Sequence, residues 1–332
     1  MYDWQKVEPE LDSTVRLIHE AAIRGHRVSI IHSNEMAIRR TIVCSTCHIL
    51  TNVNIPEDIV EFYHKATFKK ELLSLTEHDA LFLRDNPPLD NHLLNFLDTV
   101  EEDVFIVNSI SGLRKANNKI YPATLASLHD DDIANKRLIP LTTVSRNREY
   151  LKEKIEEYEN DKFIMKPMDG FGGAGVILLD KSSNNSKHNI NSLIDFYINA
   201  GKGNNFIILQ EFIETDLPGD IRVIMLNGEP IGAMRRVPAK DDHRSNVHAG
   251  GHCVMHKLTQ KEMRICKVLG PTLVEDGLYL AGIDLMGGKL IEVNVCSPGG
   301  LVEINEGENV NTQGMIIDFV EKSVKSRCNK ES

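Results

Sequence analysis

Long apolar runs are absent from this 332-residue sequence. No window approaches the ~18 uninterrupted apolar residues that a membrane-spanning helix requires. The first ten residues also lack the basic-then-apolar order of a signal peptide. These absences argue against a membrane partner and predict a cytoplasmic protein.

Positive charge is also scarce. Lys and Arg number 38 against 48 Asp and Glu, which gives a net charge of −10. No run of Lys and Arg is interleaved with aromatic residues that could follow a phosphate backbone. We therefore expect no nucleic-acid partner.

Cysteines are few and scattered. Their six positions suit a reducing compartment better than a disulfide framework. Cys44 and Cys47 form the one close pair, with His48 beside it. A zinc site needs a fourth ligand and the sequence offers no second pair, so we interpret both cysteines as plain thiols in or next to a strand.

The remaining composition is that of an ordinary globular protein, with 41% hydrophobic and 26% charged residues. A single core rarely grows past ~250–300 residues, so the length predicts two or three compact units. The expected fold class is α/β combined with α+β. We divide the chain into units over 1–117, 118–209 and 210–332.

The first unit is predicted to be an open α/β domain. Apolar periodicity predicts a helix over 12–24 and strands over 28–31, 80–84 and 104–108. A helix–strand unit of this kind normally follows a parallel strand through a right-handed crossover, yet the eleven residues before Asp12 look like the tail of a strand and a loop. We therefore expect apolar strand-forming residues just before Met1, and a more stable chain when they are present.

The second unit reads as a small α+β unit and the third as a larger mixed one. In the second, a helix over 148–158 precedes a strand over 163–167, and a strand over 176–179, a helix over 190–200 and a strand over 206–210 follow. The third unit ends in a helix over 312–324.

A Gly-rich loop, Gly170-Phe171-Gly172-Gly173-Ala174-Gly175, separates two of these strands. Glycine lets backbone amides wrap phosphate oxygens, although such loops are also ordinary hairpin turns. Strands on both sides exclude the Rossmann and Walker patterns, in which a helix follows the loop. The flanks favour a flap that closes over phosphates.

Two lysines and one strand end could serve a nucleotide. Lys166 lies on an apolar strand, where a charge needs an anionic partner such as phosphate. Lys119 has a similar setting, although alone it fits a solvated helix lysine. The segment 210–213 ends a strand and Asp220 follows it, so backbone groups could bind adenine and the carboxylate a ribose.

Three oxygen-bearing residues lie on a predicted hairpin with a Gly287-Gly288 turn. Glu292 and Asn294 are two apart and share a strand face. A two-residue turn pairs Asp284 with Ile291, whereas a three-residue loop over 287–289 pairs it with Glu292. With no balancing base on that face, the second arrangement predicts a Mg²⁺ site; the alternative is the solvated polar face of a half-exposed hairpin.

Four arginines, Arg222, Arg235, Arg236 and Arg244, form a basic group in an acidic chain. Such arginines usually pair with surplus carboxylates. A phosphoryl-transfer site also needs cations on the equatorial oxygens, which bidentate arginine provides.

Read in order, these motifs resemble the bacterial glutathione synthetases of the ATP-grasp superfamily. The matching segments are Arg84-Asp85-Asn86-Pro87-Pro88, Asn118-Lys119-Ile120-Tyr121, Met165-Lys166-Pro167-Met168-Asp169-Gly170, Gln210-Glu211-Phe212-Ile213, Asp220-Ile221-Arg222, Arg244-Ser245-Asn246 through Gly250-Gly251, and Asp284 with Glu292-Val293-Asn294. The resemblance implies an ATP-grasp fold behind a substrate domain, and a homo-oligomer. It also implies that ATP drives the joining of γ-glutamylcysteine and glycine through an acyl-phosphate.

The resemblance also assigns roles. ATP phosphates would contact Lys119, Lys166 and the loop residues Gly170, Gly172, Gly173, Ala174 and Gly175, while Gln210, Glu211, Phe212 and Ile213 would bind the adenine and Asp220 the ribose. Mg²⁺, with Mn²⁺ as an alternative, would bind Asp284, Glu292 and Asn294. Arg222 and Arg236 would act on the transferred phosphoryl group, and Arg84, Asn246, Gly250, Gly251 and Ser297 would bind substrate.

One segment departs from the family pattern. After Asn294, the chain reads Val295-Cys296-Ser297-Pro298-Gly299-Gly300 where the family has Val-Thr-Ser-Pro-Thr. The Ser-Pro-Gly form looks more like ATP-grasp ligases that add glutamate. An ATP-grasp ligase with another acceptor, such as a glutamate-adding or dipeptide ligase, and a non-catalytic nucleotide-binding module therefore stay as alternatives.

Overall fold

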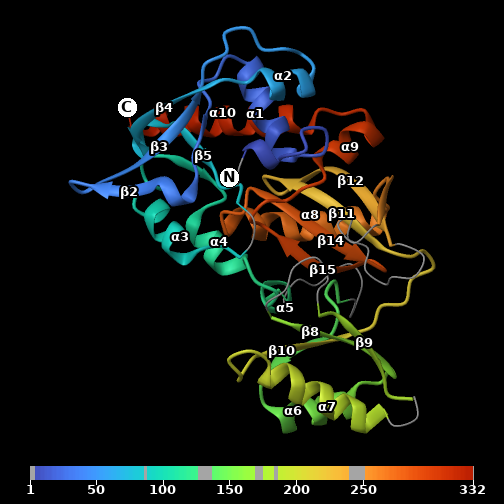
Figure 1. Cartoon of the computed structure of the whole chain (residues 1–332). Coiled ribbons are helices and arrows are strands. Elements are labelled where there is room, and N and C mark those ends of the chain that lie inside the picture. Colours follow the sequence, from blue (N-terminus) through green and yellow to red (C-terminus); the bar gives the residue numbers. More distant parts are fainter. Residues whose placement is uncertain are drawn as a thin grey trace.

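A computed structural model describes residues 4–85, 88–125, 137–168, 175–182, 186–238 and 251–331. Figure 1 shows the small sheet with its two helices below, a larger sheet in the middle and the N-terminal elements above. Within the described residues, no helix is long and apolar enough to cross a membrane.

The first described element is a short 3-10 helix, η1 (Trp4–Lys6), at a place where the sequence predicted the tail of a strand and a loop. The Trp4 ring stacks on Tyr63 with 4.9 Å between ring centroids, and the Tyr63 hydroxyl donates to the Trp4 carbonyl at 2.6 Å. These contacts anchor Trp4 on helix α2 (Ile59–Lys65).

Helix α1 (Ser13–Ile23) confirms the first predicted helix. The Asp12 carboxylate caps it by accepting from the backbone N–H groups of Thr14 at 2.7 Å and Val15 at 2.8 Å. Strand β1 (Ser29–Ile30) follows, as predicted, after Gly25 ends the helix with φ 82°.

The sheet that comes next was not predicted from the sequence. Strands β2 (Met36–Arg39), β3 (Ile42–Leu50) and β4 (Phe68–Ser74) form an antiparallel sheet in which β3 pairs with β1, β2 and β4. Arg40 and Thr41 turn the β2–β3 hairpin with φ 51° and 70°. Their residue types carry little turn signal, since Gly and Asn dominate such positions, which explains the omission. Short 3-10 helices follow β1 and β4, namely η2 (Ser33–Glu35) and η3 (Leu75–Glu77).

Parallel pairing occurs between β5 (Ala80–Phe82) and β6 (Phe105–Val107), both of which were predicted. Helix α3 (Asn91–Asp98) lies between them in the chain, and α4 (Ile110–Ala116) and α5 (Tyr121–Thr124) follow. Helix α3 contacts α4, and α5 contacts β15 (Lys289–Asn294). One apolar cluster joins side chains of these helices, such as Leu94, Leu113 and Tyr121, to Ile283 and Val293 of the larger sheet. The N-terminal region and the larger sheet therefore share a core.

The small sheet has its own core. Its strand order is β7 (Thr142–Ser145), β10 (Ile207–Glu211), β8 (Lys162–Pro167) and β9 (Ile177–Asp180), with all neighbours antiparallel. Helices α6 (Arg148–Glu157) and α7 (Ser186–Asn199) pack on one face. Leu151, Phe163 and Ile194 are fully buried between the layers, so the other face is available to the rest of the molecule.

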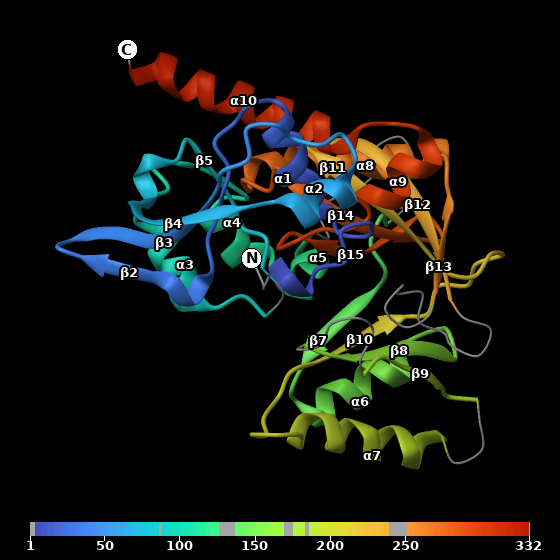
Figure 2. The same cartoon turned by 45° about the horizontal axis from the view of Figure 1, so that its top comes forward.

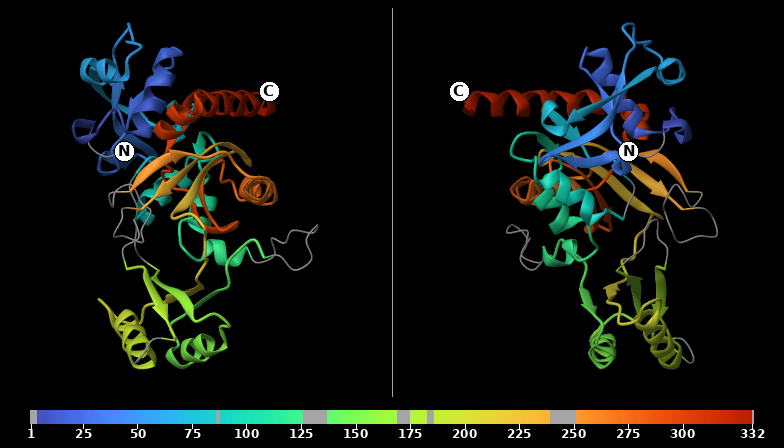
Figure 3. Two further views of the ribbon diagram at one scale, coloured as in Figure 1. Left: turned by 90° about the vertical axis from the view of Figure 1, so that its right-hand side faces the viewer. Right: turned by 60° about the vertical axis from the view of Figure 1, so that its left-hand side comes forward.

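The larger sheet is five-stranded and antiparallel. Its order is β13 (His252–Met255), β12 (Glu229–Val237), β11 (Asp220–Leu226), β14 (Leu280–Met286) and β15 (Lys289–Asn294). Helices α8 (Gln260–Glu275) and α9 (Leu301–Glu308) pack against it, as Figure 2 shows. The last helix, α10 (Thr312–Glu331), is the red helix that ends at the label C in Figure 3, and it packs against α1.

The β14–β15 hairpin combines features of both loops considered from the sequence. Met286 pairs with Lys289, so the turn has the two residues Gly287 and Gly288, and the three-residue loop is wrong. A register shift between Asp284 and Leu285 leaves one extra residue on β15. The bulge therefore brings Asp284 opposite Glu292, which a two-residue turn alone would not do.

Candidate active site

Strand pairing in the larger sheet brings together the charged residues that the sequence predicted as site residues. Arg222 on β11 lies opposite Asp284 on β14, and Asp284 lies opposite Glu292 on β15. On the other side of β11, Asp220 lies opposite Arg236 on β12. Since residues two apart share a strand face, all five side chains belong to one surface of the sheet.

Asp284 is the centre of this group and is only 1% exposed. Its carboxylate accepts from Arg222 Nε at 2.5 Å and Nη2 at 3.0 Å, and Arg236 Nη2 lies 2.8 Å from Oδ2. Burial alone would raise the pKa of Asp284, but the charges and hydrogen bonds of Arg222 and Arg236 hold it below its usual value. Asp284 is therefore ionised at neutral pH.

These contacts correct one expectation, that the acidic face carries no balancing base. Two arginines reach it from neighbouring strands because β11 lies between β12 and β14. Spacing along the sequence cannot reveal this, since 62 positions separate Arg222 from Asp284.

Asp220, expected to bind a ribose, pairs with Arg236 in this structure. Arg236 Nε donates to Asp220 Oδ1 at 3.0 Å, and Nη2 donates to Oδ2. Arg236 thus bridges the buried carboxylates of Asp220 and Asp284.

The pKa of Glu292 is shifted in the opposite direction from that of Asp284. Within the described part of the chain, its carboxylate has no hydrogen-bond or ion-pair partner. Burial and the nearby charge of Asp284 raise its pKa, against the attraction of Lys166 and Arg222. Asn294 completes the group, since its Nδ2 donates to Asp284 Oδ2 at 3.2 Å. A half-buried acid beside a second acid and an amide fits a divalent cation that takes oxygen ligands.

The small sheet contributes Lys166 to the site, from the side that lies opposite the larger sheet. Lys166 on β8 donates from Nζ to Gln210 Oε1 at 2.7 Å, and Gln210 Nε2 donates to Thr142 Oγ1 at 3.0 Å. Burial lowers the pKa of Lys166, with Glu292 opposing the shift and Lys119 adding to it. Both lysines therefore lie within electrostatic reach of Glu292, in the region between the two sheets.

The end of β10 and the segment after it contact the β14–β15 hairpin. Glu211 pairs with Lys289, and Lys162 lies 6.0 Å from the centroid of the Phe212 ring. A Cβ on Gly287 would come within 2.5 Å of Ile213 Cγ2. Because Gly287 also has φ 56°, glycine is required there for both conformation and space.

The segment after Asn294, which departs from the family's sequence pattern, joins the site to the N-terminal region. Ser297 Oγ donates to the Asp85 carbonyl at 2.7 Å, and Arg84 Nη1 donates to the Pro298 carbonyl at 3.0 Å. Gly300 has φ 110°, and a Cβ there would lie 2.6 Å from Met234 Cε. Glycine at this position is thus a conformational requirement of the turn.

Several predicted residues fall outside the described structure: Gly170, Gly172, Gly173, Ala174, Asn246 and Gly250, together with Arg244. Two at the borders are described. The carbonyl of Gly175 accepts from the Tyr197 hydroxyl at 2.9 Å, and Gly251 immediately precedes β13.

The cysteine pair behaves as interpreted. Cys44 and Cys47 both lie on β3 and are free and buried. Three positions apart on a strand, they point to opposite faces, and His48 instead lies 3.0 Å from Glu35. Burial raises the pKa of the Cys47 thiol to about 11, so it is not a reactive thiolate at neutral pH.

Sequence reasoning missed the residues that hold the site from behind. Asp85 accepts from Ser297, Lys289 pairs with Glu211, and Thr142 orients Gln210. Of these, Lys289 directly follows the Gly287-Gly288 turn that the sequence predicted.

Two antiparallel sheets, each covered by two helices, with acids, lysines and arginines between the sheets, form the arrangement of the ATP-grasp class. Among solved structures, the chain resembles an ATP-grasp ligase from Chryseobacterium gregarium, associated with ribosomally made peptides and bound to ADP and a leader and core peptide, with a TM-score of 0.61 over 96% of this chain and 95% of that one. The sequence identity is 15%, so this likeness concerns the fold.

Sequence comparison identifies the family. The model of the prokaryotic glutathione synthetase N-terminal domain matches residues 1–114, and that of the ATP-grasp domain matches residues 132–309. Glutathione synthetases of Gloeobacter violaceus and a Synechocystis strain are 33% identical over 325 residues and 32% identical over 329, covering 95% and 96% of this chain and 93% and 96% of theirs. The chain belongs to the prokaryotic glutathione synthetase family.

Proposed function

We propose that this protein is a glutathione synthetase that joins γ-glutamylcysteine to glycine at the expense of ATP. Membership of the family implies an ATP-dependent ligase that forms a C–N bond and uses a divalent metal. The observation that carries the proposal is the acidic and basic cluster around Asp284, which lies within the matched ATP-grasp domain.

The nucleotide is proposed to lie between the two sheets. Lys119 and Lys166 would bind its phosphates, with the flap over 170–175 closing above them. The segment 210–213 would receive the adenine and Asp220 the ribose. The charges of Lys119 and Lys166 act on the pKa of Glu292, and those of Lys119 and Glu292 act on the pKa of Lys166. This electrostatic proximity supports the placement.

Mg²⁺ is the proposed metal, held by Asp284, Glu292 and Asn294. Glu292 supports the assignment best, because its raised pKa reflects a charge that a cation would compensate. When bound, the metal would neutralise charge on the phosphate oxygens.

The chemistry follows from the weakness of a carboxylate as an electrophile, since its leaving group would be oxide. The substrate carboxylate attacks the γ-phosphorus of ATP, and the bond to ADP breaks as an acyl-phosphate forms. The glycine amine then attacks the acyl carbon, phosphate leaves with the bonding electron pair, and the amine proton passes to solvent. Positioning and electrostatic stabilisation supply the rate enhancement, so no side-chain nucleophile is needed.

Arg222 and Arg236 are proposed to stabilise the transferred phosphoryl group. Their guanidinium planes are fixed by two carboxylates, so little side-chain entropy is lost when they meet an anion. The flap would keep water from hydrolysing the acyl-phosphate.

Substrate is proposed to bind near Arg84, Ser297 and Gly251, together with Asn246 and Gly250. Arg84 lies beside the Ser297 turn, at the junction of the N-terminal region and the larger sheet. We further propose units over 1–117, 118–209 and 210–332, a cytoplasmic location, a homo-oligomer, and no nucleic-acid partner.

An ADP-release assay tests the function. Purified protein should release ADP only when γ-glutamylcysteine, glycine and Mg-ATP are all present, and omission of either substrate should stop release. Equal turnover with glutamate in place of glycine would contradict the proposal. It would favour a glutamate-adding ligase, the alternative suggested by the Ser297-Pro298-Gly299-Gly300 turn.

A further inference from the structure

A group of metal-ligating side chains lies in the N-terminal sheet, on a different sheet from the acidic cluster of β14 and β15. It consists of His32, Glu35 and His48. Each offers one ligand atom, an imidazole nitrogen or a carboxylate oxygen, and these three atoms lie within 4.8 Å of one another. The proposed ligase reaction uses none of these residues, so their proximity needs a separate explanation.

The backbone brings the three side chains together from different elements. His48 lies on β3 directly opposite Ile30 of β1, so these two side chains share a face of the sheet. His32, two residues after Ile30, has an extended backbone with φ -95° and ψ 136°, which returns its side chain to the same face. Glu35 ends η2, the single 3-10 turn that follows.

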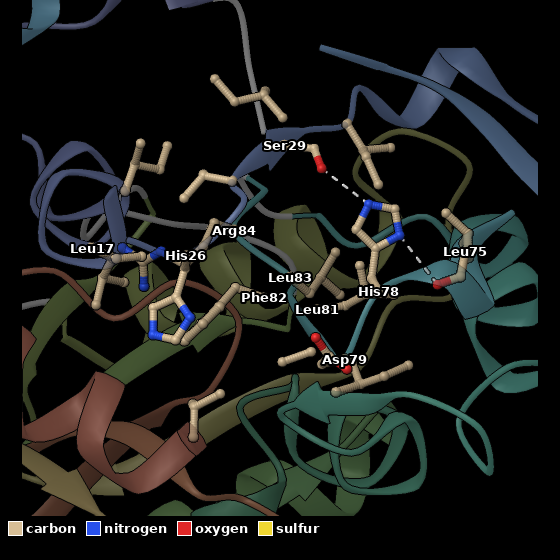
Figure 4. A pocket seen from close by; sticks show the side chains of 18 of the residues that line it. Leu17, His26, Ser29, Leu75, His78, Asp79, Leu81, Phe82, Leu83 and Arg84 are labelled. Carbon is tan, nitrogen blue, oxygen red and sulfur yellow. Dashed lines mark hydrogen bonds between the residues drawn. The ribbon is translucent and has the colours of Figure 1, made fainter. Parts of the chain in front are cut away.

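Strand β1 also borders a cavity of about 710 Å³, together with α1, α10 and β5. Figure 4 shows Ser29 of β1 pointing toward His78 at this cavity, with its Oγ 3.0 Å from Nε2 of that ring. Because successive side chains of a strand point to opposite faces, Ser29 and the His48 side chain lie on different faces of the sheet. The ligating group is therefore separate from the cavity.

Distances within the group fit a small cation. Glu35 Oε2 lies 3.0 Å from His48 Nε2, and the ring centroids of His32 and His48 are 5.0 Å apart. Ligand atoms bound at 2.0–2.1 Å to a tetrahedral Zn²⁺ are roughly 3.3 Å from one another. The three ligand atoms are thus already close to that spacing, and small side-chain rotations would complete it.

The surroundings also suit a metal ion. The side chains of His48 and Glu35 are 20% and 25% exposed, so protein shelters one side of the group and solvent reaches the other. Cys47, next to His48 on β3, is fully buried and points to the opposite face. Lys70, opposite His48 on β4, is exposed, so water hydrates its ammonium group. The donor set is therefore two imidazoles and one carboxylate, with an open side for water.

We propose that His32, Glu35 and His48 form a Zn²⁺ site whose fourth ligand is water. Imidazole ligands favour Zn²⁺ over Mg²⁺ and Ca²⁺, which prefer oxygen. Three protein ligands and one water are a common tetrahedral set for Zn²⁺. The ion replaces the hydrogen of the bond between Glu35 and His48, and it fastens η2 to β3.

Isothermal titration of the full chain with Zn²⁺ tests the site. Excess Mg²⁺ is present to occupy oxygen-ligand sites, and every protein carries Cys328→Ser, because an exposed thiol also binds Zn²⁺. The parent should bind about one equivalent. His48→Gln and Glu35→Gln should each weaken binding by at least ~100-fold, since loss of an outer-shell partner alone costs 10–100-fold. His64→Gln, which removes an exposed histidine of α2, is the matched control and should leave binding unchanged.

Two further measurements identify the ligands and the effect on the fold. Co²⁺ in place of Zn²⁺ should give the visible absorption of a tetrahedral site without the near-ultraviolet band of a thiolate ligand. Zn²⁺ at about 100 times its Kd should slow hydrogen exchange at the amides of 33–36 by about 100-fold, because opening of this segment releases the ion. Equal binding by the parent and H48Q, a thiolate band, no Zn²⁺ uptake in excess Mg²⁺, or unchanged exchange with Zn²⁺ bound would each overturn the proposal.

Discussion

The larger sheet and the N-terminal region differ in how completely their strands are flanked by other strands. In the larger sheet, β12, β11 and β14 each have strand neighbours on both edges, and the buried Asp284 is compensated by two arginines. In the N-terminal region, β1 and β5 have one strand neighbour each among the described residues, and both border a cavity. The first region holds one buried acid, Glu292, whose pKa is raised by burial and by the charge of Asp284. The second region has spare apolar volume. The comparison therefore separates a site suited to a charged ligand from a region that tolerates a larger apolar side chain.

The largest effect should follow from Asp284→Asn. Neutralising the carboxylate leaves Arg222 and Arg236 buried with one fewer countercharge, which costs about 3–5 kcal/mol of unfolding free energy. Turnover should fall by roughly 10³-fold, since these arginines and the metal group lose their common anchor. ADP release and urea unfolding measure the two effects.

Asp98→Asn is the matched control, because Asp98 forms an exposed pair with Arg114 and should cost at most ~1 kcal/mol. The Asp284 contribution also has a defined pH dependence. Since its folded pKa is lowered, the stabilisation is present above the unfolded value of about 3.9 and is lost as pH falls through the folded pKa. Equal stability of parent and D284N at pH 7 would contradict the central role of Asp284.

Glu292→Gln should weaken divalent metal binding by roughly 100-fold, yet stabilise the metal-free protein slightly. The folded pKa of Glu292 is raised, so its ionised form lowers stability above the unfolded value of about 4.3. E292Q should therefore unfold at higher urea than the parent at pH 7 and at the same urea near pH 4. Isothermal titration with Mg²⁺ and Mn²⁺ checks the first effect. Loss of stability in E292Q would show instead that the carboxylate is well paired.

Gly300→Ala should cost about 1–3 kcal/mol of stability, because a side chain is strained at φ 110° and would meet Met234. Gly299→Ala, where a Cβ meets nothing within 4 Å, should have little effect. Thermal unfolding of the two variants makes the comparison. Similar losses in both would show that the turn as a whole, and not the left-handed residue, limits substitution.

Ala21→Leu and Ala281→Leu compare the two regions directly. Ala21 faces the cavity, so the larger side chain should gain about 1 kcal/mol by burying apolar surface. Ala281 is fully buried within the larger sheet, and the same change should cost about 1–3 kcal/mol through overpacking. Opposite shifts in the urea midpoint confirm the contrast, whereas a loss in A21L would mean that the cavity has no spare volume.

Local pattern was sufficient for much of the fold. Apolar periodicity and capping residues predicted α1, α6, β5, β6, β8 and β10, because each has its own hydrophobic spacing or a clear boundary such as Asp12 or Gly25. The β2–β3–β4 sheet was missed because its hairpin turns at Arg40 and Thr41, which are unusual residues for positive φ. The bulge in β15 was missed because no residue type marks it.

The sequence by itself determined the family and the chemical types at the site, because the ordered motifs around Lys166, Asp220 and Asp284 require no knowledge of distant contacts. Only the tertiary structure decided which charges compensate which. Arg222 and Arg236 reach Asp284 because strand order in the sheet brings together residues that lie 62 and 48 positions apart. Glu292, beside Asp284, is left with a raised pKa. Likewise, the apolar character of β1 and β5 is written in the sequence, but only the tertiary structure places these strands, α1 and α10 around one cavity.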